Sequence, residues 1–306
     1  MRIFKNRGDI YFSKTNKEKS TEQKILIIAL AVIVVFTVVF VTALSVKYDF
    51  SAKKFFAPDD LQATQISQEE DTPLPQVSGK TNFITLVNSD GKLLFVSLLQ
   101  VDMDNVSYKT SVLKAETLCD GNTLADIYAG SGAQNVKKAV ESLMGVSFDY
   151  YISMDNRKFS EFFDSLGDFN YPVLSEIKFK SRDKAVNYSL KLKAGEQKLS
   201  GQQVINLIRY NIEENNNTSA ANDLMLNSLL QLVNSENAAN SEELFKLLVT
   251  TADTNITVRD FSLSGDNITV LADDRTGAGA YSAVAEYEGN SLSKESLQKI
   301  KGYFVK

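Results

Sequence analysis

Residues 82–101, NFITLVNSDGKLLFVSLLQV, contain two apolar runs separated by a polar turn. The runs are 83–87 and 93–101, and the turn is Asn88-Ser89-Asp90-Gly91. Short continuous apolar runs bounded by turn residues are typical of strands that are buried on both faces. We therefore predict two neighbouring strands in the interior of a sheet that other elements cover.

Strand and helix patterns alternate without a repeat from this segment to the end of the chain. The predicted helices are 133–144, 158–166, 200–209, 224–233, 241–250 and 293–304. The other predicted strands are 107–113, 148–154, 177–180, 186–192, 254–263, 267–271 and 281–288, and the predicted loops include 213–221 and 273–279. This order predicts that residues 81–306 form a three-layer α/β/α domain with a central mixed β-sheet.

Toward the N-terminus, the chain changes from a polar linker to an uncharged apolar segment. The linker, 47–80, holds three of the four prolines and is otherwise polar, so we expect it to be flexible. The segment 25–46, ILIIALAVIVVFTVVFVTALSV, carries no charge. A bilayer core needs about 20 apolar residues in a helix, so we predict a transmembrane signal-anchor helix here. A buried core helix and a cleaved signal peptide are the alternatives.

Charge on either side of the predicted span sets its orientation. Residues 1–24 are rich in Lys and Arg, and acidic residues soon follow the span on its other side. The positive-inside rule then places this tail in the cytoplasm and residues 47–306 outside. We expect a single-pass plasma-membrane protein with an extracytoplasmic C-terminal domain.

Composition excludes several kinds of site. The chain has no histidine and one cysteine, Cys119, which excludes a Ser-His-Asp triad, a histidine-ligated zinc site and a thiolate metal cluster. The net charge is −5, and an acidic domain is unsuited to binding nucleic acid through its phosphates. Any chemistry must use carboxylates, Lys, Arg, Tyr, Ser or a hard metal ion.

Several local patterns, in order, resemble the LytR-CpsA-Psr family of cell-envelope proteins. The segment 192–203, with Arg209 closing its helix, looks like that family's "L-x-x-G-x-x-x-L-x-G-x-x-A-L" helix start. The segment 145–151, GVSFDYY, resembles "G-I-x-I-D-Y-Y". Further similar segments are the helix ending at Leu166-Gly167, the Tyr128-Ala129 to Gly132 region, a strand near 268–271 and the final helix. The resemblance covers roughly residues 81–304.

The resemblance implies a function. Members transfer glycopolymers from an undecaprenyl-pyrophosphate carrier to peptidoglycan, and they use Mg²⁺ and clustered arginines around the pyrophosphate. Bidentate guanidinium groups and a hard cation suit a ligand with several negative charges.

This sequence departs from the family pattern where that chemistry is expected. Lys114 and Ala115 stand where "S-I-P-R-D" has arginine and aspartate, and Arg209-Tyr210-Asn211 keeps one arginine of "R-x-R". The later arginines have no counterpart in 213–231. Lys114 and Arg209 remain as candidate phosphate-binding residues, and Asp90 is the candidate Mg²⁺ ligand. Each of these side chains can equally be an ordinary solvated residue at the end of an element.

Three interpretations follow from these observations. In the first, the chain is a degenerate member that binds a polyprenyl-pyrophosphate-linked glycopolymer or peptidoglycan without catalysis. In the second, it is an active phosphotransferase whose site is rebuilt from other basic residues, which are Arg157, Arg182, Arg259 and Arg275. In the third, it is a scaffold of an envelope assembly, which an exposed apolar patch without a basic pocket would favour.

Overall fold

The computed structural model describes residues 73–181 and 187–306. Residues Asp71–Lys306 form one compact unit. The predicted cytoplasmic tail, the predicted span 25–46 and most of the predicted linker lie outside the described residues. Within the described ranges, no helix is both long enough and apolar enough to cross a bilayer.

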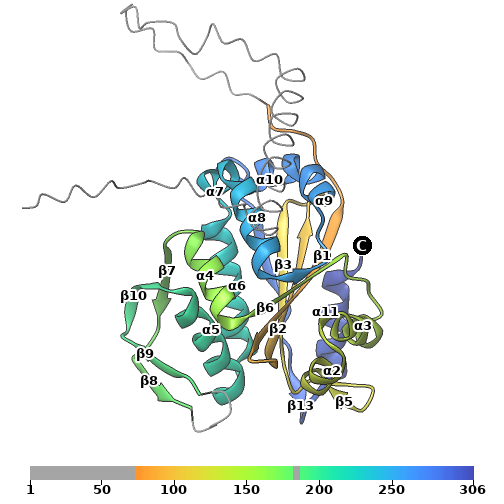
Figure 1. The fold of residues 1–306 in the computed structure, drawn as a ribbon, viewed down its shortest axis with the longest axis vertical. Coiled ribbons are helices and arrows are strands. Elements are labelled where there is room, and N and C mark those ends of the chain that lie inside the picture. The colour runs from red at the N-terminus through yellow and green to blue at the C-terminus, as the bar shows by residue number, and fades with distance from the viewer. Residues whose placement is uncertain (1–72, 182–186) are drawn as a thin grey trace, which may run out of the picture. The chain divides into compact units, whose positions relative to one another are not determined.

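A six-stranded mixed sheet forms the middle of the unit, in the order β11-β6-β1-β2-β3-β12 (Figure 1). Its strands are β1 (Lys80–Ser89), β2 (Lys92–Asp102), β3 (Ser107–Lys114), β6 (Tyr150–Asp155), β11 (Asp253–Thr254) and β12 (Gly279–Ser282). β1 pairs with β6 in parallel and β3 pairs with β12 in parallel, whereas the other pairs are antiparallel. The predicted central mixed sheet is confirmed.

The two apolar runs of 82–101 form the hairpin β1–β2 at the centre of this sheet. Ile84 pairs with Leu98 and Leu86 with Val96, and all four side chains are fully buried. Asp90 and Gly91 make the turn with φ of 48° and 79°. Positive φ is inexpensive for Gly and tolerated by Asp, which explains why this pair occupies the turn.

One face of the sheet is covered by α2 (Leu124–Ser131), α3 (Ala133–Met144) and α11 (Lys294–Phe304) (Figure 1). Its apolar cluster joins Ile84, Leu86, Val96 and Leu98 of the hairpin to side chains of these three helices. Ser293 caps α11, because its side chain accepts a hydrogen bond from the Ser296 N–H. Cys119 is also buried in this cluster.

The opposite face is covered mainly by α4 (Asn156–Ser165), α5 (Gly201–Arg209) and α6 (Thr218–Leu232). A second apolar cluster joins Val87, Phe95 and Val112 of the sheet to these helices. The other helical elements are a π-helical turn (Tyr210–Glu214), α7 (Ser235–Ala239), α8 (Ser241–Thr251), α9 (Val258–Leu263) and α10 (Gly265–Ala272). The remaining strands are β4 (Leu118–Cys119), β5 (Asn122–Thr123), β7 (Phe169–Val173), β8 (Ile177–Lys180), β9 (Ser189–Leu192), β10 (Gly195–Leu199), β13 (Tyr287–Glu288) and β14 (Ser291–Leu292).

Four sequence predictions about the C-terminal half are wrong. The predicted strands 254–263 and 267–271 are mostly α9 and α10, so the family-like strand near 268–271 is also a helix. The β-branched residues of these segments are typical of strands, which explains the error. Thr257 and Asp260 form a capping box, which marks the start of a helix. The predicted loop 213–221 contains a π-helical turn and the first turn of α6, and the predicted strand 281–288 is split between β12 and β13.

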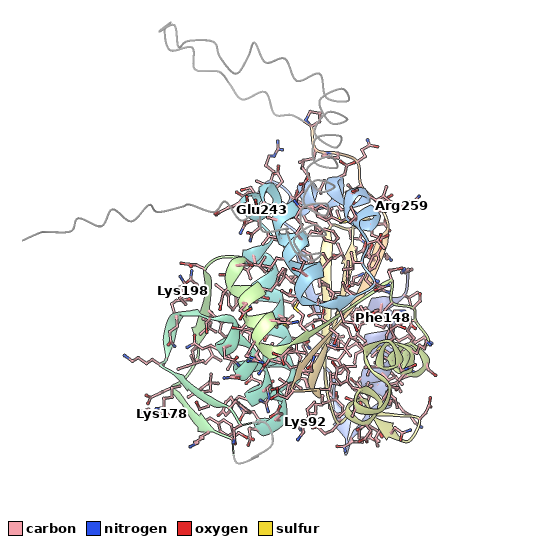
Figure 2. The ribbon with its side chains drawn as sticks, viewed as in Figure 1. Lys92, Phe148, Lys178, Lys198, Glu243 and Arg259 are labelled. Atoms are coloured by element: carbon pink, nitrogen blue, oxygen red, sulfur yellow. The ribbon has the colours of Figure 1, made fainter. Side chains whose placement is uncertain are left out.

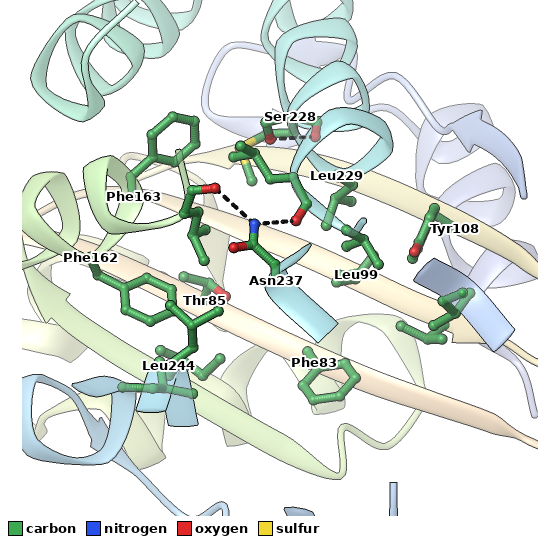
Figure 3. A pocket seen from close by; sticks show the side chains of 18 of the residues that line it. Phe83, Thr85, Leu99, Tyr108, Phe162, Phe163, Ser228, Leu229, Asn237 and Leu244 are labelled. Carbon is green, nitrogen blue, oxygen red and sulfur yellow. Dashed lines mark hydrogen bonds between the residues drawn. The ribbon is translucent and has the colours of Figure 1, made fainter. Parts of the chain in front are cut away.

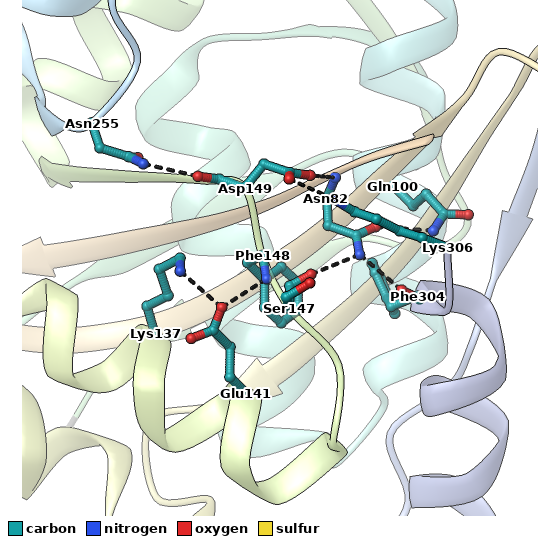
Figure 4. A network of polar contacts seen from close by, with 10 residues as sticks. All are labelled: Asn82, Gln100, Lys137, Glu141, Ser147, Phe148, Asp149, Asn255, Phe304 and Lys306. Carbon is teal, nitrogen blue, oxygen red and sulfur yellow. Dashed lines mark hydrogen bonds and ion pairs between the residues drawn. The ribbon is translucent and has the colours of Figure 1, made fainter. Parts of the chain in front are cut away.

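A chain of buried polar groups ties the C-terminus to the sheet. The Asn82 side-chain amide donates to the carbonyl oxygens of Ser147 and Phe304 at 2.9 and 2.8 Å, and Gln100 donates to its amide oxygen (Figure 4). The chain continues through Lys109, whose ammonium contacts Gln100 and pairs with Asp102 at 2.8 Å. Burial disfavours a charged Asp102, but hydrogen bonds from Lys109 and Asn105 outweigh it and lower the pKa of Asp102.

We predict that Asp102→Asn lowers the free energy of unfolding of residues 71–306 by about 2 kcal/mol at pH 7. Because the pKa of Asp102 is lower in the folded chain, its contribution is present above its ordinary value of 3.8 and is lost as the pH falls through the folded value. Urea unfolding from pH 7 to pH 3 should therefore show the two proteins converging below pH 3.8. Asp104→Asn, at an exposed aspartate, is the control and should change little.

Candidate functional site

The predicted site residues gather at one end of the sheet. β1, β3 and β6 run in the same direction and finish at this end, which Lys92 at the start of β2 marks in Figure 2. Asp90 follows β1, Lys114 ends β3, and Arg209 ends α5. Topology therefore brings residues that are distant in sequence to a common edge.

Arg209 is held by an internal carboxylate and an aromatic ring. Its Nε donates to Glu213 Oε1 at 2.7 Å and its Nη2 donates to Glu213 Oε2 at 3.1 Å. The guanidinium carbon lies 4.0 Å from the centre of the Tyr188 ring. This residue is only 5% exposed. A bidentate pair on an aromatic face is a strong, oriented arrangement, so an incoming anion has to compete with Glu213 for the guanidinium.

Glu213 belongs to the π-helical turn that continues α5. Burial, together with the charges of Glu116 and Glu214, raises the pKa of Glu213 above its usual range despite the pairing with Arg209. The carboxylates of Glu116 and Glu214 therefore act on Glu213 beside Arg209, and their charges oppose the approach of an anion to this arginine.

Lys114 is also committed to contacts within the protein. Its ammonium contacts the amide oxygen of Asn216 and lies 4.7 Å from the centre of the Tyr287 ring. Its backbone N–H donates to the Tyr287 hydroxyl at 3.0 Å. Asn216 follows the π-helical turn that carries Glu213, so Lys114 and Arg209 are brought to the same loop.

Asp90 is close to a second carboxylate that sequence reasoning missed. The Asp90 N–H faces Asp155 Oδ2 at 3.4 Å, and Asp155 also caps α4. This contact joins the Asp90 backbone to the Asp155 carboxylate, and Mg²⁺ is often held by one or two carboxylates that share it with substrate phosphates. Among the described residues, no group of three or more His, Cys, Asp or Glu side chains could enclose a metal.

Among the other arginines that could rebuild the site, Arg157 lies at this end, where it pairs with Asp155 at 3.6 Å and keeps its side chain 80% exposed. Arg275 pairs with Asp273. Arg259 lies at the other end of the unit from Lys92 (Figure 2). Arg182 is outside the described residues.

A cavity of about 460 Å³ lies between the sheet and helices α4, α6, α8 and α10 (Figure 3). Its sheet side is formed by residues of β1, β2, β3 and β6, including Phe83 and Leu99. Phe159, Phe162 and Phe163 of α4 line its helix side. None of the lining residues within 73–181 and 187–306 is charged. This lining suits a hydrocarbon chain. No local sequence pattern predicts the cavity, because its lining residues come from many separate segments.

Packed side chains separate the cavity from Lys114 and Arg209. On β3, Thr110 lines the cavity, Val112 is fully buried in the second cluster, and Lys114 ends the strand. Four residues of strand span about 13 Å, so Lys114 does not border the cavity. Val87 and Phe95 lie in the same intervening layer.

The sequence model of the LytR_cpsA_psr family matches residues 85–299, which include the whole candidate site. The chain belongs to this family. No curated protein matches the chain.

Solved structures share the fold of this LytR_cpsA_psr protein. A candidate transcription regulator from Eubacterium siraeum aligns with a TM-score of 0.65 at 18% identity, over 80% of this chain and 98% of that chain. TagV of B. subtilis aligns with a TM-score of 0.56 at 16% identity, over 74% and 96% of the two chains. TagT, solved bound to LI-WTA, aligns with a TM-score of 0.53 at 13% identity, over 76% and 92%.

We predict that Glu213→Gln raises the affinity of this LytR_cpsA_psr domain for inorganic pyrophosphate about tenfold, equivalent to about 1.4 kcal/mol. Glutamine keeps the size of the side chain but removes the charge that neutralises Arg209. Calorimetric titration at fixed salt measures the change. Glu214→Gln removes the same formal charge beside the pair and should raise the affinity less than threefold. Equal gains from both variants would mean that only the overall charge matters.

Proposed function

We propose that this LytR_cpsA_psr protein is a membrane-anchored, extracytoplasmic envelope protein that binds a polyprenyl-linked glycopolymer and has lost efficient transfer. The pairing of Arg209 with Glu213 carries the proposal. The family chemistry suggested by the sequence resemblance needs guanidinium groups directed at a pyrophosphate, and here the surviving arginine is directed at the protein's own carboxylate.

The charge balance supports a loss of affinity for a pyrophosphate. Each charge-assisted contact contributes about 1.5–3 kcal/mol, and the pattern of several arginines is reduced to Arg209 and Lys114. Lys114 acts as a point charge without the bidentate fork of arginine, and Glu116, Glu213 and Glu214 repel an incoming anion. A ligand phosphate must therefore displace existing partners for fewer contacts.

The apolar cavity supports retained binding of a lipid chain. Ligand cavities commonly span about 300–1,000 Å³, and they are mostly apolar. The cavity of about 460 Å³ falls in this range. TagT, which shares the fold, has been solved bound to LI-WTA, and we extend to this chain the binding of a related envelope polymer.

The alternative function is an active phosphotransferase that moves a glycopolymer from undecaprenyl pyrophosphate to peptidoglycan. The contact of the Asp90 backbone with the Asp155 carboxylate favours it, because two aspartates at one strand edge could hold a Mg²⁺ ion shared with the pyrophosphate. Bound there, Mg²⁺ would neutralise phosphate charge. Lys114 and Arg209 would then orient the phosphates only after leaving Asn216 and Glu213.

We predict that farnesyl pyrophosphate binds the full-length chain in nanodiscs weakly, with a Kd above about 100 μM, and that Mg²⁺ changes this less than threefold. Arg209→Ala should also change the Kd less than threefold, because Glu213 already occupies the guanidinium. Calorimetry on folded protein with and without Mg²⁺ measures these values. Tight binding that requires Mg²⁺ and falls tenfold in Arg209→Ala and Asp90→Asn would instead support the active transferase.

Localisation is part of the proposal and rests on residues 1–46. We predict that the full chain sediments with membranes and resists extraction by carbonate, whereas a chain starting at Asp71 is recovered in the soluble fraction. Protease added to intact protoplasts should digest the domain and leave the tail 1–24 protected. Digestion of the tail instead of the domain would reverse the proposed orientation.

A further inference from the structure

The β8–β9 hairpin presents a row of lysines on its solvent-facing side. In sequence, residues 177–193, IKFKSRDKAVNYSLKLK, hold six Lys or Arg residues and one Asp, in a chain whose net charge is −5. Lys178 lies directly opposite Lys191 in the antiparallel register, and Lys180 lies opposite Ser189. Side chains that are opposite each other, or two positions apart on a strand, project to the same face. The three lysines therefore share one face, and all of them are exposed.

The opposite face of the hairpin is packed against the protein, which fixes the direction of the lysines. Leu190 is 1% exposed and belongs to the second apolar cluster, together with side chains of α5. The centre of the Phe179 ring lies 5.2 Å from the centre of the Tyr210 ring, and Tyr188 covers the Arg209 guanidinium. The apolar and aromatic residues of the hairpin thus face inward, and the lysine face is turned to solvent.

The stability of the hairpin does not explain this arrangement. Like charges directly opposite each other on a strand pair are destabilising, so Lys178 and Lys191 repel each other. Lys178 pairs with Glu176, but both side chains are more than half exposed, and such a pair contributes little. Lys180 and Lys191 form no ion pair with the residues in 73–181 and 187–306. Lysine also discourages edge strands from pairing with other chains, yet that purpose does not require two lysines in opposite positions. An anionic partner accounts for the row.

The geometry of the lysine face suits an extended polyanion. Positions two apart along a strand are separated by about 7 Å, and opposite side chains by about 5 Å, so the charges form a spread row and not a cage. Lysine ammonium groups are flexible, strongly hydrated point charges. They suit a chain whose phosphate groups recur along its length better than one compact pyrophosphate. Lys193, which directly follows β9, adds a further exposed ammonium group.

Nucleic acids and bilayer surfaces are anionic partners that fit this face less well. Proteins bind single-stranded nucleic acid by stacking bases on aromatic side chains, and Phe179 and Tyr188 of the hairpin face inward. Basic segments that lie on bilayers usually add an apolar face, whereas Lys178 and its neighbours share their face with Ser189. Lys178 also lies toward the Lys92 end of the unit (Figure 2). The chain from the predicted span enters β1 at the opposite end of the sheet.

We propose that the lysine face of the β8–β9 hairpin binds a polyanion whose phosphate groups recur along an extended chain. The inference rests on the proposed function for the identity of this polyanion, which is the polymer portion of the envelope glycopolymer. It goes beyond that function because it assigns a second surface that uses none of Asp90, Lys114 and Arg209. The two sites adjoin, since Tyr188 connects the hairpin to Arg209.

Titration with a lipid-free oligomer of glycerol phosphate tests this proposal on the full-length chain in phosphatidylcholine nanodiscs. The matched probe is dextran, an uncharged polysaccharide. We expect the affinity for the oligomer to fall about tenfold or more between 50 and 200 mM salt, because bound phosphates release counter-ions. Dextran should not bind. Equal binding of the two probes, or oligomer binding that does not respond to salt, would overturn the proposal.

Variants locate the bound polymer. Lys178→Gln with Lys191→Gln should weaken oligomer binding at least tenfold at low salt and reduce the salt slope by about 1 to 2. Lys294→Gln with Lys299→Gln removes the same charge from exposed positions of α11 and should change the affinity less than threefold. Because the hairpin variant relieves the repulsion between two lysines, its melting temperature should equal or exceed that of the wild type. Equal losses in the two variants would overturn the proposal.

Two further measurements distinguish this surface from the alternatives. Lys178→Arg with Lys191→Arg keeps the charge and should bind the oligomer within threefold of the wild type, whereas a loss as large as that of the glutamine variant would contradict recognition by charge. Co-sedimentation with phosphatidylglycerol vesicles that exceeds oligomer binding and disappears in the glutamine variant would assign the surface to a bilayer instead. Farnesyl pyrophosphate titration of the same samples measures the proposed function separately, so either hypothesis can fail while the other stands.

Discussion

Burial of the β1–β2 hairpin on both faces is the constraint on which the rest of this structure depends. Side chains such as Ile84 and Leu98 point to one face and Phe95 and Val87 to the other, and all are 1% exposed or less. A sheet with two apolar faces must be covered on both, because each exposed aliphatic or aromatic side chain forgoes roughly 1.5–3 kcal/mol of burial free energy. The helices α2, α3 and α11 on one side and α4, α5 and α6 on the other meet this requirement.

The two faces are covered to different degrees. The face under α2, α3 and α11 is packed and is also linked by polar groups, since Asn82 connects β1 to the carbonyl at Phe304. The opposite face is packed only toward the end of the sheet where Lys114 lies, and elsewhere the helices leave a cavity. An apolar hollow of this size is typical of the sites at which proteins hold small ligands.

The candidate site gathers charged residues that are distant in sequence at one edge of the sheet. The strand ends bring Asp90, Lys114 and the end of α5 to this edge. Both cations have partners within the protein, because Glu213 pairs with Arg209 and Asn216 with Tyr287 contacts Lys114. The apolar cavity and the charged residues Lys114 and Arg209 are thus separate features, and substitutions can change one of them without the other.

The β1–β2 hairpin, α3 and α11 follow from local patterns, because apolar runs, turn residues and caps such as Ser293 act over a few neighbouring residues. The resemblance to the family and the place of Arg209 at the end of its helix can likewise be identified from the sequence. The helices α9 and α10 were mistaken for strands, since their β-branched residues outweighed the Thr257 cap in the pattern. The pairing of Arg209 with Glu213, the approach of Asp155 to Asp90 and the cavity depend on three-dimensional packing. Local patterns specify elements, whereas side-chain partners and voids arise only when elements distant in sequence are packed together.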